Sequence, residues 1–219
     1  MRFANYLRFL SVLAVLMAGI GCHARRDNVL PTVTDRSRCS NITEYFPPAG
    51  TPWTTGFHFG DEWGESVSQI LKMMHEPSLY WCEAGVPDAQ YRFIWIRSFN
   101  DPIAIRLSVH ANGTGTLFIH SLKGWMAGYP PKPGINSTRE ITSDQTKHAL
   151  ELFKQIDFMD KRNRFDISST DGSNWIFEAN EGGRYQLVEF RDPTPEAQRF
   201  GLYLMLDLAK LPLTKDEIY

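Results

Sequence analysis

The sequence predicts an α+β domain with a single antiparallel sheet of about five to six strands and flanking helices. Two pairs of β-branched and aromatic stretches are each interrupted by a glycine-containing turn, which is typical of β-hairpins. Three other segments repeat apolar residues at helical spacing, before, between and after these hairpins. This order of elements is an α+β arrangement on one sheet.

Composition limits the function classes. The chain has 219 residues, of which 42% are hydrophobic and 22% charged, enough for one domain with a sizeable core. A net charge of -2 provides no basic field, so we expect no nucleic-acid partner. No apolar run reaches the roughly 18 residues of a membrane-spanning helix, so any membrane contact is expected through an N-terminal lipid alone.

The first residues have the pattern of an export signal. Arg2 and Arg8 precede the apolar run 9–20, and small residues and Cys22 follow. A basic start, an apolar centre and a small-residue end are typical of a secretory signal peptide. We therefore expect residues 1–21 to be removed as the chain is exported to the bacterial cell envelope.

Two cleavage sites fit this signal. One is a signal peptidase I site within 18–24, which yields a periplasmic protein. The other is a lipoprotein site before Cys22, which places a lipid on the Cys22 sulfur and anchors the chain to the membrane. We favour the lipoprotein form, although Gly19 occupies the position where leucine is usual.

The other two cysteines then form one possible pair. Cys39 and Cys82 could form a disulfide in an oxidising compartment, and two separate buried thiols are the alternative. Residues 22–56 are rich in proline and small polar residues, which predicts a flexible tether. Residues 57–219 are expected to form the single α+β domain.

The first half of that domain starts with a helix. Apolar residues at helical spacing predict it over 65–74. A strand over 91–98 is aromatic and β-branched and is expected to be buried on both faces. Alternation then predicts a hairpin with the loop 111–115, in which Val109 lies opposite Leu117.

The second half starts with a loop. Residues 123–137 contain several prolines and glycines, which predicts a long surface loop, followed by a short strand over 138–141. Ser143 is the expected N-cap of a helix. A second hairpin turns at Gly182 and Gly183 and pairs Trp175 with Phe190 and Phe177 with Val188. Thr194 and Pro195 begin a last helix that extends to Leu211.

Two carboxylates of the second hairpin are candidate catalytic residues. Glu178 lies opposite Leu187 in the expected register, so Glu189 is its diagonal neighbour on the same face, about 7 to 8 Å away. Such a pair could act as acid and base in glycoside hydrolysis if one carboxyl stayed protonated. The more ordinary alternative is surface ion pairing with nearby arginines, namely Arg97, Arg106 or Arg184.

Aromatic residues in loops are candidate binding residues. An exposed tryptophan offers a broad apolar face with a hydrogen-bond donor. Trp95 and Trp175 lie in strands and are expected in the core. The candidate contact residues lie in loops: Trp53, Trp63, Trp125 and Tyr129.

No motif predicts a cofactor or a metal ion. The chain contains no nucleophile elbow, no paired-histidine zinc motif and no glycine-rich phosphate loop. His110 and His120 are expected on one face of the first hairpin but about 13 Å apart, which is too far for a shared ligand.

Three segments support a resemblance. YRFIWIR, the DGSNW turn followed by Glu178, and the GGRY return strand resemble an uncharacterised family of small exported bacterial proteins and lipoproteins. The resemblance covers roughly residues 66–211 and implies export, but no catalytic residue.

Together these observations favour a non-catalytic binding domain of the cell envelope, whose partner is an envelope protein or peptidoglycan. An envelope glycan hydrolase that uses Glu178 and Glu189 is the alternative.

Overall fold

The computed structural model describes residues 45–47, 62–81, 89–125, 130–156 and 172–218. It confirms the α+β fold: one antiparallel sheet has the strand order β4-β3-β2-β1-β5-β6. The strands are β1 (Ala89–Arg97), β2 (Ile103–Val109), β3 (Gly115–Lys123), β4 (Lys132–Ile141), β5 (Ser173–Glu181) and β6 (Arg184–Phe190). The helices are α1 (Glu62–Met73), α2 (Ser143–Phe153) and α3 (Pro195–Leu202), with a π-helical turn at Tyr203–Leu208 and a 3-10 turn at Lys215–Glu217.

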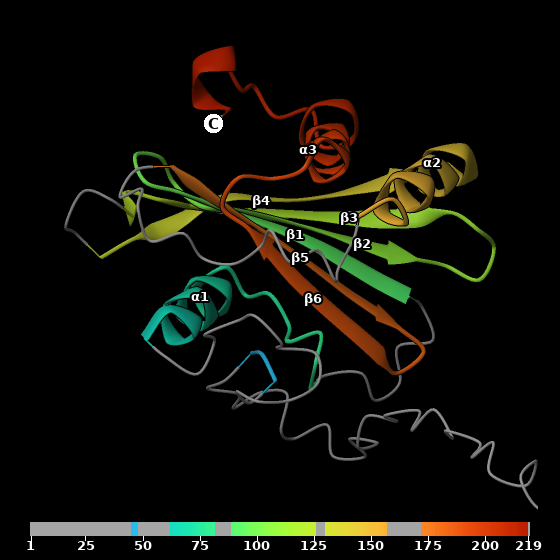
Figure 1. Ribbon diagram of the computed structural model, residues 1–219, viewed down its shortest axis with the longest axis horizontal. Coiled ribbons are helices and arrows are strands. Elements are labelled where there is room, and N and C mark those ends of the chain that lie inside the picture. The colour runs from blue at the N-terminus through green and yellow to red at the C-terminus, as the bar shows by residue number, and fades with distance from the viewer. Residues whose placement is uncertain (1–44, 48–61, 82–88, 126–129, 157–171, 219) are drawn as a thin grey trace, which may run out of the picture.

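The elements form three layers. Helices α2 and α3 cover one face of the sheet and α1 lies against the other (Figure 1). We call the first the apolar face, because the side chains buried on it are almost all apolar, including Phe93, Trp95, Leu107, Trp175 and Phe177. We call the second the ionic face, because charged side chains are buried there among the apolar ones. Both faces therefore pack against their helices through an apolar core, and the ionic face has buried charges in addition.

Helix α3 lies very close to the sheet. Thr194 caps it and Pro195 begins it, as expected, but its regular α-helical part ends at Leu202 and a π-helical turn follows. Gly201 is buried against Trp175, and a Cβ there would lie 2.4 Å from Trp175 Cζ3. The absence of a side chain at this position is what allows the close approach.

The end of α1 directs the chain into the sheet. His75 N–H donates to Lys72 O and Glu76 N–H donates to Leu71 O, which is the bond pattern of a Schellman turn. His75 supplies the left-handed residue of this turn, with φ 58. The next side chain, Glu76, is thereby placed over the ionic face.

The register of the first hairpin differs from the prediction by two residues. Leu107, not Val109, lies opposite Leu117, and Val109 lies opposite Gly115. A Cβ at Gly115 would lie 2.7 Å from Leu107 Cδ1, so a larger residue where β3 begins would displace the Leu107 side chain. Because strand side chains alternate, a shift of two residues leaves the apolar residues on the expected face.

The predicted loop over 123–137 is wrong in extent. Strand β3 continues to Lys123 and β4 begins at Lys132, so the expected short strand has ten residues. A β-bulge between β3 and β4 accommodates Pro133 in this edge strand. The N-cap of α2 is Thr142 rather than Ser143, because its hydroxyl and the Gln145 side chain form a capping box.

Part of the expected tether is packed. Tyr45 and Phe46 are 8% and 4% exposed and belong to the core of the ionic face. Ser78 Oγ donates to Tyr45 O at 2.6 Å, and Tyr45 N–H donates to Ser68 Oγ at 3.3 Å. Apart from residues 45–47, the stretch 22–56 lies outside the described residues, as does the expected signal peptide. Within the described part, no helix has the length and apolarity needed to span a bilayer.

Substitution of Gly201 by alanine is expected to lower the free energy of unfolding by about 1 to 3 kcal/mol, because the new methyl group overlaps the buried Trp175 ring. At an open helical position the same change stabilises a protein by about 0.5 to 1 kcal/mol. Chemical denaturation of the wild type and Gly201→Ala measures this difference, and a stabilised variant would show that the contact is not close.

Candidate functional site

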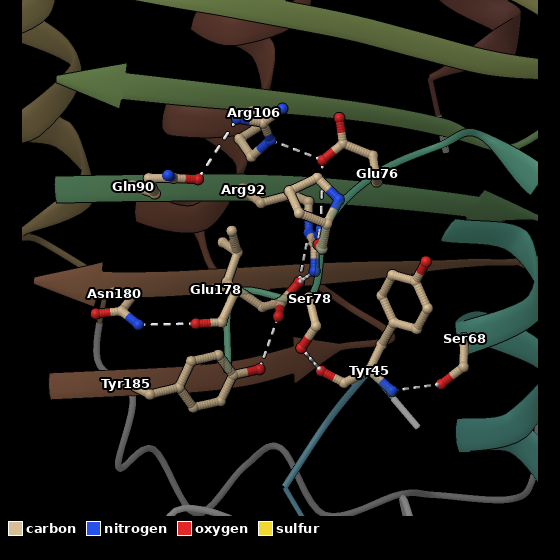
Figure 2. A network of polar contacts seen from close by, with 12 residues as sticks. Tyr45, Ser68, Glu76, Ser78, Gln90, Arg92, Arg106, Glu178, Asn180 and Tyr185 are labelled. Atoms are coloured by element: carbon tan, nitrogen blue, oxygen red, sulfur yellow. Dashed lines mark hydrogen bonds and ion pairs between the residues drawn. The ribbon is translucent and has the colours of Figure 1, made fainter. Parts of the chain in front are cut away.

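A row of charged side chains crosses the ionic face (Figure 2). Arg92 on β1 lies directly opposite Glu178 on β5 and directly opposite Arg106 on β2. Arg92 and Glu178 are 0% exposed and Arg106 is 9% exposed. Two guanidinium groups are therefore adjacent in a buried environment, where like charges repel strongly unless an anion lies between them.

Glu76 is that anion. Its Oε2 accepts from Arg106 Nε at 2.9 Å and from Arg92 Nη1 at 3.3 Å, and its Oε1 lies 2.7 Å from His120 Nδ1. Arg92 Nη1 also donates to Pro77 O at 2.6 Å. The segment after α1 is thus attached to three strands by charge-assisted hydrogen bonds.

Glu178 completes the network on the other side of Arg92. Arg92 Nε and Nη2 lie 2.7 and 2.6 Å from its Oε2, and Tyr185 Oη donates to its Oε1 at 2.7 Å. Asn180 Nδ2, two residues along β5, donates to Leu79 O at 2.7 Å. Glu178 therefore lies inside a bonded cluster rather than at the surface.

The charges of this cluster balance. Burial alone would raise the pKa of Glu76, but the His120 hydrogen bond and the charges of Arg106 and Arg92 together lower it to about 2. Burial would lower the pKa of Arg92, but Glu178 and Glu76 outweigh this and raise it. Because arginine keeps its proton in proteins, Glu178 is the anion of its pair, although burial raises its pKa. Two carboxylates thus neutralise two guanidinium groups.

Glu189 has a different environment. It is 4% exposed, its Oε1 accepts from Trp63 Nε1 at 3.2 Å, and its Oε2 is buried without a hydrogen-bond partner. Burial raises its pKa to about 7, although the Trp63 hydrogen bond and the charge of Arg191 act in the opposite direction. A substantial fraction of Glu189 is therefore protonated at neutral pH.

The structure brings the two candidate catalytic carboxylates to the expected register. Glu178 lies opposite Leu187 and Glu189 lies opposite Ile176, so the pair is diagonal on the ionic face. The cation bound to Glu178 is Arg92, which is not one of the expected partners Arg97, Arg106 and Arg184. Both carboxyl groups are buried, and both oxygens of Glu178 accept hydrogen bonds.

The structure describes two of the four candidate binding residues, Trp63 and Trp125. Trp63 is partly buried and uses its indole N–H on Glu189, so a predicted binding residue contacts a predicted catalytic one. Trp125 is partly buried, and its backbone N–H donates to Asp101 Oδ1 at 2.9 Å. Trp53 and Tyr129 lie outside the described residues. The role of all four residues in binding a partner stays a prediction.

Trp125 marks one end of the sheet. The turn from β1 to β2, the end of β3 and the start of β4 lie at this end (Figure 1), and the Trp125 to Asp101 hydrogen bond joins the residue after β3 to the turn. Arg97 Nη2 donates to Asp101 O at 2.7 Å and holds the turn. Phe99, in the same turn, is 67% exposed. We call Phe99 and Trp125, on this braced turn and loop, the aromatic end.

Histidines and cysteines add no further site in the described part of the chain. His120 is bound to Glu76, and His110 Nε2 lies 2.8 Å from Thr116 Oγ1. No group of three metal-ligating side chains occurs among the described residues. The lipidation residue Cys22 and the possible disulfide pair, Cys39 and Cys82, lie outside them.

Sequence reasoning missed the residues at the centre of this network. Arg92 lies within a strand expected to be buried on both faces, and a buried arginine requires an anion. The sequence could therefore have predicted that Arg92 binds a buried carboxylate such as Glu178. Glu76 carried no comparable signal, because its position depends on the turn at His75.

Comparison with known proteins adds no assignment: no protein-family model matches the chain, and no curated protein is significantly similar to it.

Substitution of Glu76 by glutamine is expected to lower the free energy of unfolding by about 3 to 5 kcal/mol at pH 7, because Arg92 and Arg106 lose the anion between them. Glu151→Gln, on the exposed surface of α2, is the control and should have little effect. Denaturant unfolding measures both. A loss below about 1 kcal/mol for Glu76→Gln would show that the two arginines do not need this carboxylate.

The raised pKa of Glu189 gives a second prediction. A carboxyl whose pKa rises to about 7 on folding stabilises the folded state most below its ordinary pKa of 4.5, and this contribution is lost as the pH rises through 7. Relative to Glu189→Gln, the wild type should lose about 2 to 3 kcal/mol between pH 5 and pH 8.5. Unfolding of both proteins at the two pH values measures this, and parallel pH profiles would contradict it.

Proposed function

We propose that the protein is a non-catalytic binding domain of the bacterial cell envelope that recognises another envelope protein through the aromatic end. Export, and anchoring through a lipid on Cys22, belong to the same proposal and rest on the N-terminal sequence pattern. The alternative, a glycan hydrolase that uses Glu178 and Glu189, is the competing outcome of the tests below.

The observation that carries the proposal is the state of Glu178. A glycosidase acid or nucleophile must reach the sugar and change its protonation or bonding during the reaction. Glu178 is 0% exposed and is occupied by Arg92 and Tyr185 on its two oxygens. A carboxylate that neutralises a buried arginine in this way supports structure rather than acid catalysis, and this favours binding over hydrolysis.

The aromatic end supports a contact surface. Phe99 is 67% exposed, and the turn that carries it is held by Arg97 and Asp101. Asp101 also holds the backbone of Trp125 at the start of the β3–β4 loop. Large aromatic side chains on a braced turn lose little conformational freedom on binding, and aromatic residues contribute strongly to protein interfaces. An envelope protein is the partner that we propose for this surface, and peptidoglycan is the alternative partner.

The test is binding by the Phe99→Ala/Trp125→Ala double variant. The exported chain, purified as the cell processes it, should retain a defined protein from an extract of its own envelope, and the double variant should retain at least tenfold less. Lys147→Ala is the matched control, because its side chain is 77% exposed on α2, away from the aromatic end. Mass spectrometry identifies the retained protein.

Purified peptidoglycan separates the two functions. If the chain shortens this glycan and Glu178→Gln or Glu189→Gln stops the shortening, the protein is an enzyme and the proposal is wrong. If glycan is bound but not shortened, the partner class is wrong although binding remains the function. If the double variant and Lys147→Ala retained equal amounts of the protein, the aromatic end would not be the binding surface.

A further inference from the structure

Strand β4 is an exposed edge of the sheet. Its residues from Lys132 to Glu140 are all exposed, whereas the other edge strand, β6, is buried at most positions. Among the described elements, β4 packs substantially against β3 alone. An edge strand of this kind presents unpaired backbone groups to which another strand can add.

The direction of those backbone groups follows from the hairpin. His110 N–H donates to Thr114 O, which sets the hydrogen-bonded pairs of β2 and β3 at even-numbered residues of β3. The odd-numbered residues of β3 therefore point to β4, and they lie opposite Ser137, Arg139 and Ile141. By the same alternation, the backbone groups of the residues between them point outward: Asn136, Thr138 and Glu140.

The two halves of β4 differ as pairing surfaces. Pro133 and the β-bulge interrupt the first half, and such features protect an edge from pairing. From Ile135 to Ile141 the strand has no proline and pairs regularly with β3 from Asn136 onward. The accessible pairing segment is therefore I-N-S-T-R-E-I.

We infer that this segment pairs antiparallel with the same segment of a second copy of the chain, about a two-fold axis at Thr138. In this register Thr138 lies opposite its own copy, and Asn136 lies opposite Glu140 of the second copy. Ser137 then lies opposite Arg139 and Ile135 opposite Ile141. The outward backbone groups meet one another and form about six main-chain hydrogen bonds.

The side chains favour this occupant. The register places an amide donor against a carboxylate, threonine against threonine and isoleucine against isoleucine, which are stabilising cross-strand pairs. No like charges lie directly opposite each other. Ile135, 38% exposed in the single chain, gains a partner beside Ile141, which is 4% exposed at the edge of the core. The segment is thus complementary to itself.

Cysteine cross-linking tests the axis. In the full chain, two copies of Thr138→Cys would have Cα atoms about 5.5 Å apart, within the range of a disulfide. Asn136→Cys is the matched control, because its two copies lie four residues apart along the strand, about 13 Å. Mild oxidation should give at least fivefold more disulfide dimer for Thr138→Cys than for Asn136→Cys or for the wild type, whose three cysteines set the background.

A mixed experiment tests the register. Asn136→Cys oxidised together with Glu140→Cys should give a mixed dimer at least fivefold above either variant alone, because these positions face each other across the interface. Equal yields from Thr138→Cys and Asn136→Cys, and no gain on mixing, would overturn the proposal. Cross-linking of Thr138→Cys to a different polypeptide would also overturn it, since the edge would then serve another partner.

Discussion

The structure depends on one carboxylate placed between two arginines. Arg92 and Arg106 lie opposite each other on neighbouring strands, and Glu76 accepts hydrogen bonds from both. Without this anion, the centre of the ionic face would hold two adjacent cations with almost no solvent. Apolar packing attaches α2 and α3 to one face and α1 to the other, but the segment after α1 is also attached through a bonded cluster that requires particular residues at particular places.

A shifted carboxyl pKa on the ionic face does not by itself indicate catalysis. Glu76, Glu178 and Glu189 all have shifted values, yet the causes differ. Glu76 and Glu178 serve as counterions for buried arginines. Glu189 is buried with one oxygen on Trp63 and the other unbonded. A raised carboxyl pKa is therefore insufficient evidence for catalysis on this sheet face, because burial alone produces it.

Sequence reasoning succeeded where the cause was local. The register of the second hairpin was predicted correctly, including Trp175 opposite Phe190, because two glycines fix its turn. The register of the first hairpin was wrong by two residues, because three residues rather than five separate the closing pair: His110 N–H donates to Thr114 O, and Asn112 Oδ1 accepts from Thr114 N–H. The counterion of Glu178 was missed because it is set by strand order, which no local pattern carries. The exposed Phe99 was missed because exposure within a turn has no periodicity.

The strand order also determines when the charges can be neutralised during folding. Arg92 and Glu178 are separated by 86 residues, and β1 has neighbours on both sides although it is the first of the described strands. Because synthesis starts at the N-terminus, β1 to β4 can pair as a meander before β5 and β6 are made. At that stage β1 is an edge strand, and Glu76 is the only carboxylate of the cluster that can bind Arg92. Addition of the β5–β6 hairpin completes the sheet and brings Glu178 to Arg92, so the second arginine charge is neutralised in the same step. The long loop that this step closes should make it the slow step of folding.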